Sequence, residues 1–151
     1  MAIILGADVI IRGERGTVDL SKWVASLPNE QFEVAAITVA ELWHGVERAS
    51  GKQRAAREQY LGAVLAPLPI IPYTEHTAYE HARIWAELEA AGKRIGFYDL
   101  IVGATALLRG SQVATFNKKH FAAIRGLSVV DPNSPAARII DCAALIWRRF
   151  H

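Results

Sequence analysis

Two kinds of hydrophobic pattern take turns along this chain, short apolar runs and longer stretches with helical spacing. Short apolar runs predict five β-strands, over residues 3–5, 32–37, 68–71, 112–115 and 127–130. Longer stretches between them predict helices, over residues 19–27, 38–49, 52–65, 75–91, about 97–110 and 118–124. A terminal helix is expected over residues 135–150. Strands that alternate with helices form parallel sheets covered on both faces, so the pattern predicts an α/β fold with a mainly parallel sheet of about four to five strands.

Two of the predicted helices carry sharper signals. In the helix that follows Thr74, the residues Ala78, Ala82, Trp85 and Leu88 recur at three- and four-residue steps and predict a stripe that faces the core. The helix that begins near residue 97 is apolar on every side, which is typical of a helix at the centre of a domain. A lone carboxylate, Asp99, stands at its head. Burial of an unpaired carboxylate is costly, so Asp99 either serves the helix terminus or belongs to a site.

Composition narrows the class of protein. The chain has 151 residues, of which 52% are hydrophobic and 21% charged, as in a soluble globular domain. No apolar stretch reaches about 18 residues and no basic segment opens the chain, so neither a membrane span nor a signal peptide is expected. The single cysteine, Cys142, fits a reducing compartment, and we expect a cytoplasmic protein. The net charge of +2 permits a nucleic-acid partner without requiring one.

Polar side chains follow the predicted strands, at the edge where open parallel sheets place their sites. The candidate acids are Asp8, Glu41 and Asp99. Other candidates near this edge are Thr115, Asn117 and His120, with the basic residues Lys93 and Arg94 as a possible phosphate-binding rim. Two or three carboxylates that converge there would bind a hard cation such as Mg²⁺, which polarises a phosphate and lowers the pKa of a bound water.

Each of these residues also has a purely structural interpretation. Thr38 and Glu41 fit the capping-box pattern. Asp99 could complement the positive end of the helix dipole, and Asp8 could cap the helix after the first strand. The remaining polar residues could be ordinary loop residues or solvated surface charges.

Taken in order, four segments resemble the PIN-domain ribonucleases, particularly the VapC toxins of prokaryotic toxin–antitoxin pairs. The segments are residues 3–11 (IILGADVII), 37–46 (ITVAELWHGV), 95–106 (IGFYDLIVGATA) and 113–121 (VATFNKKHF). The resemblance covers residues 3 to about 131, which suggests a PIN domain over residues 1–131 and a helical extension over 132–151.

The resemblance implies a three-layer α/β/α fold and Mg²⁺- or Mn²⁺-dependent endonucleolytic cleavage of RNA, often transfer RNA, leaving a 5′-phosphate and a 3′-hydroxyl. By position, Glu41 and Asp99 match the second and third acids of the family, and Asp8 matches a small polar residue beside the metal. Thr115 and Asn117 match a polar loop bordering the site, and His120 stands where many members have a fourth acid. A VapB-type antitoxin, an RNA substrate and a homodimer are the implied partners, with no membrane.

The first acid of the family is missing, because Leu5 is followed by Gly6. Glycine offers no ligand at this metal position, so the chain as written is expected to be impaired or inactive. Three explanations compete: a deliberately inactivated variant, which best suits a site otherwise kept; natural degeneration; or replacement of the missing ligand by Asp8. An alternative function is a non-catalytic module of the same fold that binds RNA or an antitoxin.

Overall fold

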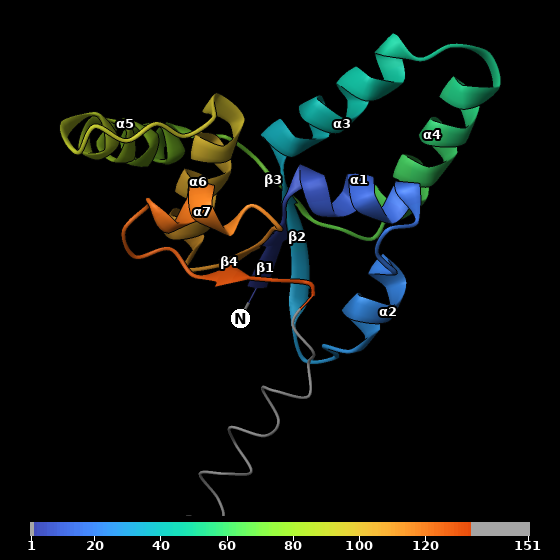
Figure 1. Ribbon diagram of the computed structural model, residues 1–151, viewed down its shortest axis with the longest axis horizontal. Coiled ribbons are helices and arrows are strands. Elements are labelled where there is room, and N and C mark those ends of the chain that lie inside the picture. The colour runs from blue at the N-terminus through green and yellow to red at the C-terminus, as the bar shows by residue number, and fades with distance from the viewer. Residues whose placement is uncertain (1, 134–151) are drawn as a thin grey trace, which may run out of the picture.

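The computed structural model describes residues 2–133 of the chain and arranges them as helices on both faces of one sheet (Figure 1). In chain order the elements are β1 (Ala2–Leu5), α1 (Ala7–Arg15), α2 (Leu20–Ala25), β2 (Gln31–Ala35), α3 (Ala36–Arg48), α4 (Gly51–Leu65), β3 (Ile70–Ile71), α5 (Glu75–Ala90), α6 (Phe97–Arg109), β4 (Gln112–Ala114), α7 (Lys118–Ala122) and β5 (Val129–Val130). The predicted α/β fold class is confirmed.

The sheet is parallel throughout, with strand order β3-β2-β1-β4-β5. The central strand β1 places Ile4 beside Glu33 of β2 and Val113 of β4. Strands β3 and β5, at the two edges, are only two residues long, shorter than the apolar runs predict. Because all strands point the same way, the residues that follow β1, β2 and β4 meet at one edge.

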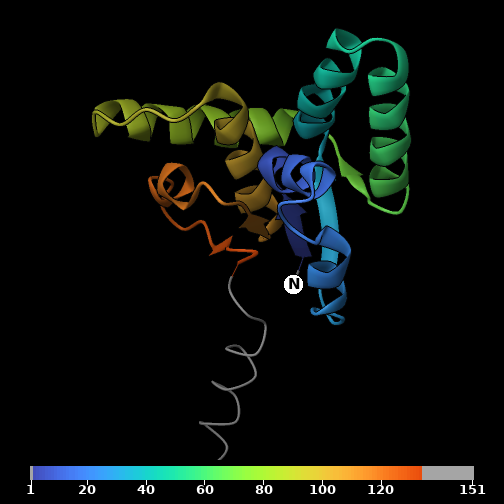
Figure 2. The ribbon, with the colours of Figure 1, turned by 45° about the vertical axis from the view of Figure 1, so that its right-hand side comes forward.

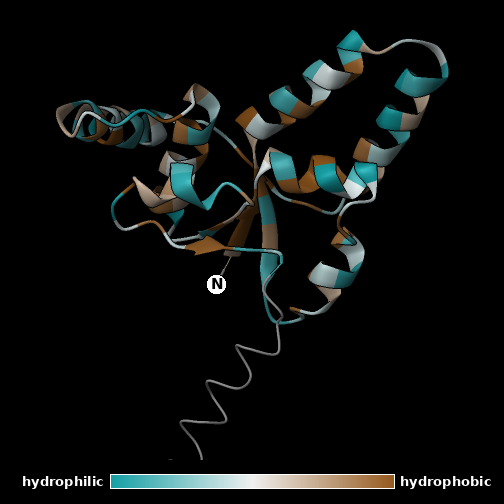
Figure 3. Ribbon diagram, in the orientation of Figure 1, coloured by the Kyte–Doolittle hydropathy of each residue, from teal (hydrophilic) through white to brown (hydrophobic). Residues whose placement is uncertain are grey.

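Two hydrophobic cores form the three layers. Ile3 and Leu5 of β1 pack with α1, α2, α3 and α4 on one face of the sheet. Ile4, between them in sequence, points to the other face and packs with α5, α6 and α7. Figure 3 shows the hydrophobic residues concentrated in the strands between the two layers. Figure 2 shows that α3 and α4 form an antiparallel hairpin that projects beyond the sheet, as predicted from the two consecutive helical stretches.

The junction between β2 and α3 differs from the prediction. The strand ends at Ala35 and the helix begins at Ala36, with no loop between them. Thr38 is therefore buried within the first turn rather than at the N-cap, which is Ala35 and makes no side-chain capping bond. Ile37 belongs to a short apolar run, and such a run alone cannot separate strand from helix. The capping-box prediction for Thr38 and Glu41 is wrong, so Glu41 has no capping role.

The buried stripe of α5 is also displaced from the predicted one. Thr74 caps this helix as predicted, and Thr77 completes the capping box. The buried residues of α5 are Thr77, His81, Ile84 and Leu88. Trp85 is 52% exposed and Ala82 is exposed, so two members of the predicted stripe face outward. The prediction was wrong because it counted only apolar residues as buried, whereas the buried face of α5 includes a threonine and a histidine.

Helix α6 confirms the expectation of a central, apolar helix. All seven residues from 100 to 106 are buried. At its other end, Arg109 makes two bonds of 2.8 Å to the carboxylate of Glu33, which is only 4% exposed on β2. This bidentate ion pair ties α6 to the sheet and explains how β2 carries a buried charge.

The predicted terminal helix over residues 135–150, and all but the first two residues of the expected extension, lie outside the described residues. None of the helices within residues 2–133 is long and apolar enough to cross a bilayer.

Candidate active site

A hollow of about 280 Å³ lies at the carboxyl edge of the sheet. In Figure 1 the helices α1, α3 and α6 lie around this end of the strands. The lining comes from the β1–α1 turn, α3, α6, and the loop between β4 and α7. The lining residues are Gly6, Ala7, Asp8, Ile11, Glu41, Asp99, Val102, Thr115, Asn117 and Phe121. The structure thus brings together the three candidate acids, Gly6 and two of the polar loop residues.

Asp8 is held by the loop that follows β4. Its Oδ2 accepts hydrogen bonds from the Thr115 hydroxyl at 3.1 Å and from the Phe116 backbone N–H at 2.8 Å. The Thr115 hydroxyl in turn accepts from the backbone N–H of Asn117 at 3.0 Å. The N-cap of α1 is Gly6, so the capping role considered for Asp8 is wrong. A backbone donor such as the Phe116 N–H has no side-chain signal, so the sequence could not reveal it.

Gly6 faces the hollow directly beside Asp8. A Cβ atom at position 6 would lie 2.7 Å from Oδ1 of Asp8 and 3.0 Å from the carbonyl oxygen of Ala114. The backbone here is extended, with φ −71° and ψ 154°, so it does not itself require glycine. The carboxylate of Asp8 therefore occupies space that a side chain at position 6 would need.

Glu41 is an acid of the site with a raised pKa. Burial, and after it the negative charges of Asp99 and Asp8, together raise the pKa of its carboxyl group from 4.5 to about 7. Within residues 2–133 no hydrogen-bond or ion-pair partner is found for this carboxylate. Glu41 is thus a half-buried acid facing two others, a position that favours either a proton or a cation.

Asp99 lies in the first turn of α6, where its charge also complements the helix dipole. His120, in the middle of the short helix α7, approaches it, with Nδ1 3.4 Å from Oδ2 of Asp99. Both side chains are partly exposed, at 52% for His120 and 31% for Asp99. His120 therefore borders the hollow through Asp99, although it does not line it.

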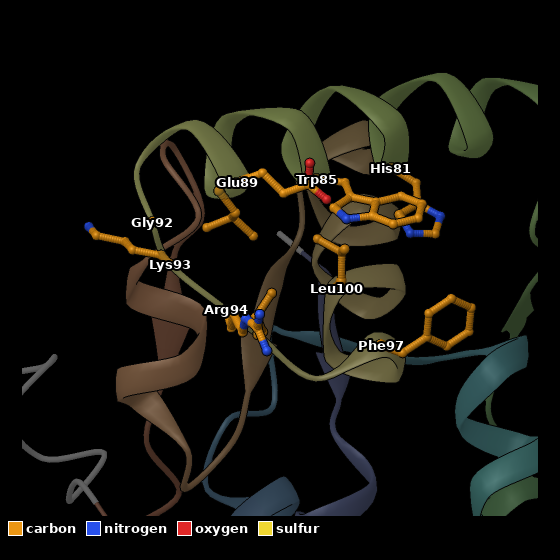
Figure 4. A pocket seen from close by; sticks show the side chains of 10 residues that line it. His81, Trp85, Glu89, Gly92, Lys93, Arg94, Phe97 and Leu100 are labelled. Carbon is orange, nitrogen blue, oxygen red and sulfur yellow. The ribbon is translucent and has the colours of Figure 1, made fainter.

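Lys93 and Arg94 do not lie in this hollow. They line a second, larger one, of about 620 Å³, between α5 and the start of α6 (Figure 4). Arg12 lies against the loop that follows β4, where its guanidinium stacks 4.0 Å from the centre of the Phe116 ring.

Within residues 2–133, no group of three or more His, Cys, Asp or Glu side chains is close enough to hold a metal ion together. Of the three acids in the hollow, Glu41 makes no hydrogen bond within residues 2–133, Asp99 is approached by His120, and one oxygen of Asp8 is engaged by Thr115 and Phe116. Two carboxylates are nevertheless a common donor set for Mg²⁺, which keeps several waters.

Residues 3–127, nearly the whole described part, match the PIN domain family. The chain belongs to this family. A "Ribonuclease VapC1" of Rickettsia felis is 30% identical over 135 residues, which cover 89% of this chain and 98% of that relative.

Solved structures agree with the PIN fold. The fold is similar to that in VapBC2 of Rickettsia felis bound to a promoter DNA fragment, with a TM-score of 0.79, 24% identity, and coverage of 87% of this chain and 98% of that one. VapBC-5 of Mycobacterium tuberculosis, a member of the VapBC family of toxin–antitoxin systems, is 30% identical with a TM-score of 0.67, covering 86% and 96% of the two chains. The three-layer architecture expected from the sequence is thus confirmed.

Proposed function

We propose that this PIN domain is the toxin of a VapBC-type pair and a divalent-cation-dependent endoribonuclease whose rate is limited by Gly6. The observation that carries the proposal is the hollow in which Glu41, Asp99 and Asp8 meet at the carboxyl edge of the sheet. The relative named a ribonuclease supports RNA as the substrate, and the similar VapBC structures support an antitoxin as the partner.

The donor set fits Mg²⁺ or Mn²⁺. Glu41 and Asp99 offer carboxylate oxygens, the ligands these ions prefer. The raised pKa of Glu41 reflects burial and neighbouring negative charge, so a positive charge is what this position lacks. When bound, the ion would polarise a phosphodiester and lower the pKa of a bound water.

Asp8 supplies the third carboxylate in this proposal. Oδ2 is fixed by Thr115 and Phe116, while Oδ1 lies where a side chain at position 6 would begin. Asp8 thus puts negative charge beside the position of the missing acid. Because its orientation is set by these two donors rather than by an ion, we expect weaker metal binding than with an acid at position 6.

The remaining site residues position and border the acids. His120 of α7 orients the Asp99 carboxylate, and Asn117 lines the hollow together with the buried Thr115. The proposal includes a VapB-type antitoxin, transfer RNA or another structured RNA as substrate, a homodimer, and a cytoplasmic location. The exposed Trp43 on α3 makes the α3–α4 hairpin a candidate dimer surface.

The test is an RNA cleavage assay with the full chain, in Mg²⁺ or Mn²⁺ and in a chelator, on a panel that includes the transfer RNAs of the host. Four proteins are compared: the chain as written, Gly6→Asp, Gly6→Asn as the uncharged control of similar size, and Gly6→Asp combined with Glu41→Gln. We expect Gly6→Asp to cleave at least about 100-fold faster than the chain as written, the scale on which charge stabilisers act in active sites. The other two variants should not gain activity.

The alternative is a non-catalytic module, which the missing acid at position 6 favours. If Gly6→Asp binds Mn²⁺ in calorimetry but cuts no RNA in the panel, the nuclease proposal fails and the module remains. Tight binding of an antitoxin by an inert Gly6→Asp protein would then support that alternative directly.

A further inference from the structure

Five aromatic or imidazole rings form a continuous row from the segment just before α5, through α5, to the first turn of α6. This aromatic row consists of Tyr73, His81, Trp85, Phe97 and Tyr98. His81 is its hub: its ring centre lies 6.0 Å from Tyr73, 5.9 Å from Trp85 and 6.0 Å from Phe97. Phe97 in turn lies 5.6 Å from Tyr98. Tyr98 directly precedes Asp99 in the first turn of α6.

Four rings of the aromatic row are unusually open to solvent. Trp85 is 52% exposed, Phe97 60%, Tyr73 46% and Tyr98 48%. Large aromatic side chains gathered in one exposed patch mark an interaction site rather than a core. The misplaced stripe of α5 has the same cause, because Trp85 belongs to this patch and not to the interior.

Three rings of the aromatic row, His81, Trp85 and Phe97, line the 620 Å³ hollow, whose size lies in the roughly 300–1,000 Å³ range of ligand pockets. Figure 4 shows the rings of His81 and Trp85 together beneath α5, with Phe97 projecting from the start of α6. Lys93 and Arg94 lie on the other side of Leu100 in this view. The hollow therefore offers ring faces on one side and cationic groups on the other.

The charges of this hollow favour an anion. Lys93 and Arg94 are exposed, and within residues 2–133 neither takes part in an ion pair. Glu89 is the one acid among the lining residues of this hollow, against two cations. Arg83, on the same helix, is not available, because Glu80 and Glu87 engage it at 2.6 and 2.7 Å.

His81 adds a polar position within the aromatic row. Its Nδ1 is 2.9 Å from the Tyr73 hydroxyl, and its Nε2 is buried with no hydrogen-bond partner within residues 2–133. Burial lowers the pKa of this imidazole, which keeps the ring neutral at pH 7. A neutral ring nitrogen without a partner can donate or accept, as the edge of a nucleobase requires, once Trp85 or Phe97 reorients.

The geometry points to a nucleotide-binding subsite for single-stranded RNA in this hollow. Bases stack on Trp85 and Phe97, while Lys93 and Arg94 bind the phosphates between them. The first turn of α6 joins the two hollows, since Phe97 lines this one and Asp99 the acid site. This inference rests on the proposed function, because it takes RNA as the substrate and places the nucleotides that flank the cleaved bond.

The test measures binding apart from cleavage. A fluorescently labelled single-stranded RNA of about eight nucleotides is titrated with the full chain in a chelator, and the Kd is read from anisotropy. We expect Trp85→Ala and Phe97→Ala each to raise the Kd about tenfold, as loss of one stacked base does. Combined Lys93→Ala and Arg94→Ala should raise the Kd and flatten its salt dependence.

Tyr79→Ala is the matched control. Tyr79 is also an exposed aromatic residue of α5, at 65%, but its hydroxyl bonds Glu75 and it lies outside the aromatic row. Its variant should bind RNA as the unaltered chain does. Circular dichroism checks that each variant is folded, and light scattering gives its oligomeric state.

Two results overturn the subsite. One is a Kd that is unchanged in Trp85→Ala, Phe97→Ala and the double basic variant. The other is a shift from dimer to monomer in Trp85→Ala or Phe97→Ala, which would make this face a contact between copies of the chain. Failure of the nuclease proposal looks different, because Gly6→Asp would then cut nothing while the RNA affinities still followed the aromatic row.

Discussion

The carboxylate of Asp8 stands in the place of a side chain at Gly6: its Oδ1 is 2.7 Å from where a Cβ of residue 6 would lie. The two positions therefore cannot both be filled without movement. Asp8 is fixed by the Thr115 hydroxyl and the Phe116 N–H, so moving it breaks or bends two hydrogen bonds. Any residue larger than glycine at position 6 is coupled to Asp8.

This coupling is measurable as stability. Gly6→Ala should lower the free energy of unfolding by about 1–3 kcal/mol, the usual penalty for overpacking. Asp8→Ala removes the carboxylate that a Cβ at position 6 would meet, so in that background Gly6→Ala should lower the free energy of unfolding by at least about 0.5 kcal/mol less. Urea denaturation of the unaltered chain, the two single variants and the double variant measures this coupling. Strictly additive changes in the free energy of unfolding would contradict the predicted contact.

Glu41 should make stability depend on pH. Its pKa is about 7 in the folded chain against 4.5 as the reference value, so the folded state holds a proton that the unfolded state has lost between these values. Stability from this group is therefore present below about pH 4.5 and declines as the pH rises to about 7. In a chelator, Glu41→Gln should remove that part of the decline. If the melting temperatures of the unaltered chain and Glu41→Gln change with pH by the same amount between about pH 5 and 8, this role of Glu41 is contradicted.

The same proton competes with a cation. Ionised Glu41 is needed to bind Mn²⁺, so affinity should fall about tenfold for each pH unit below 7 and level off above it. Calorimetry with Mn²⁺ in buffers of different ionisation enthalpy measures the affinity and the proton released. An affinity that does not change between pH 5.5 and 7 would exclude Glu41 as a ligand.

The ion pair between Glu33 and Arg109 should matter far more than those on the surface. Arg109→Ala leaves the buried Glu33 carboxylate without its bidentate partner and should cost about 2–3 kcal/mol, less than a fully buried pair because Arg109 is 41% exposed. The matched control is Arg83→Ala, because its partners Glu80 and Glu87 are 24% and 41% exposed, against 6% for the Glu33 side chain, and its loss should cost under about 1 kcal/mol. Equal losses in chemical denaturation would refute the distinction.

Gly103, on the buried face of α6, is packed against Ile124 in the segment that follows α7. A Cβ there would lie 2.5 Å from Cδ1 of Ile124. Gly103→Ala should therefore be better tolerated by at least about 0.5 kcal/mol in an Ile124→Val background, which lacks that methyl group. Thermal and urea unfolding of the single and double variants provide the comparison; the same cost in both backgrounds would argue against this contact.

Much of the fold follows from local pattern. The five strands and the central helix α6 are visible in the sequence because an apolar run bounded by polar residues has few alternatives. The start of α3 cannot be predicted from the sequence, since Ile37 suits a strand as well as a helix. In the structure β2 ends at Ala35, the last residue that pairs with β3. The outward face of Trp85 also escapes the pattern, because residue type does not say which side of a helix meets the sheet.

The site divides in the same way. Glu41 and Asp99 could be predicted because acids after strands of a parallel sheet meet at one edge. The two hydrogen bonds that fix Asp8 could not be predicted, since one donor is a backbone N–H and the other is the hydroxyl of Thr115, 107 residues away in sequence. The separation of Lys93 and Arg94 from the acids likewise depends on how α5 packs on α6, which is a tertiary property.

The direct passage from β2 into α3 limits how the length of this chain can vary. Each residue advances a helix by about 100°, so one residue inserted between Ala35 and Ala36 would turn Glu41 about 100° away from Asp99. Gly6 is likewise the only residue between β1 and α1. Insertions and deletions should therefore be tolerated at the far end of the hairpin, near Ser50, and be lethal to activity at these two junctions. A scan of single-residue insertions that compares these two junctions with the hairpin end near Ser50 would show loss of activity at the junctions and retention at the hairpin end.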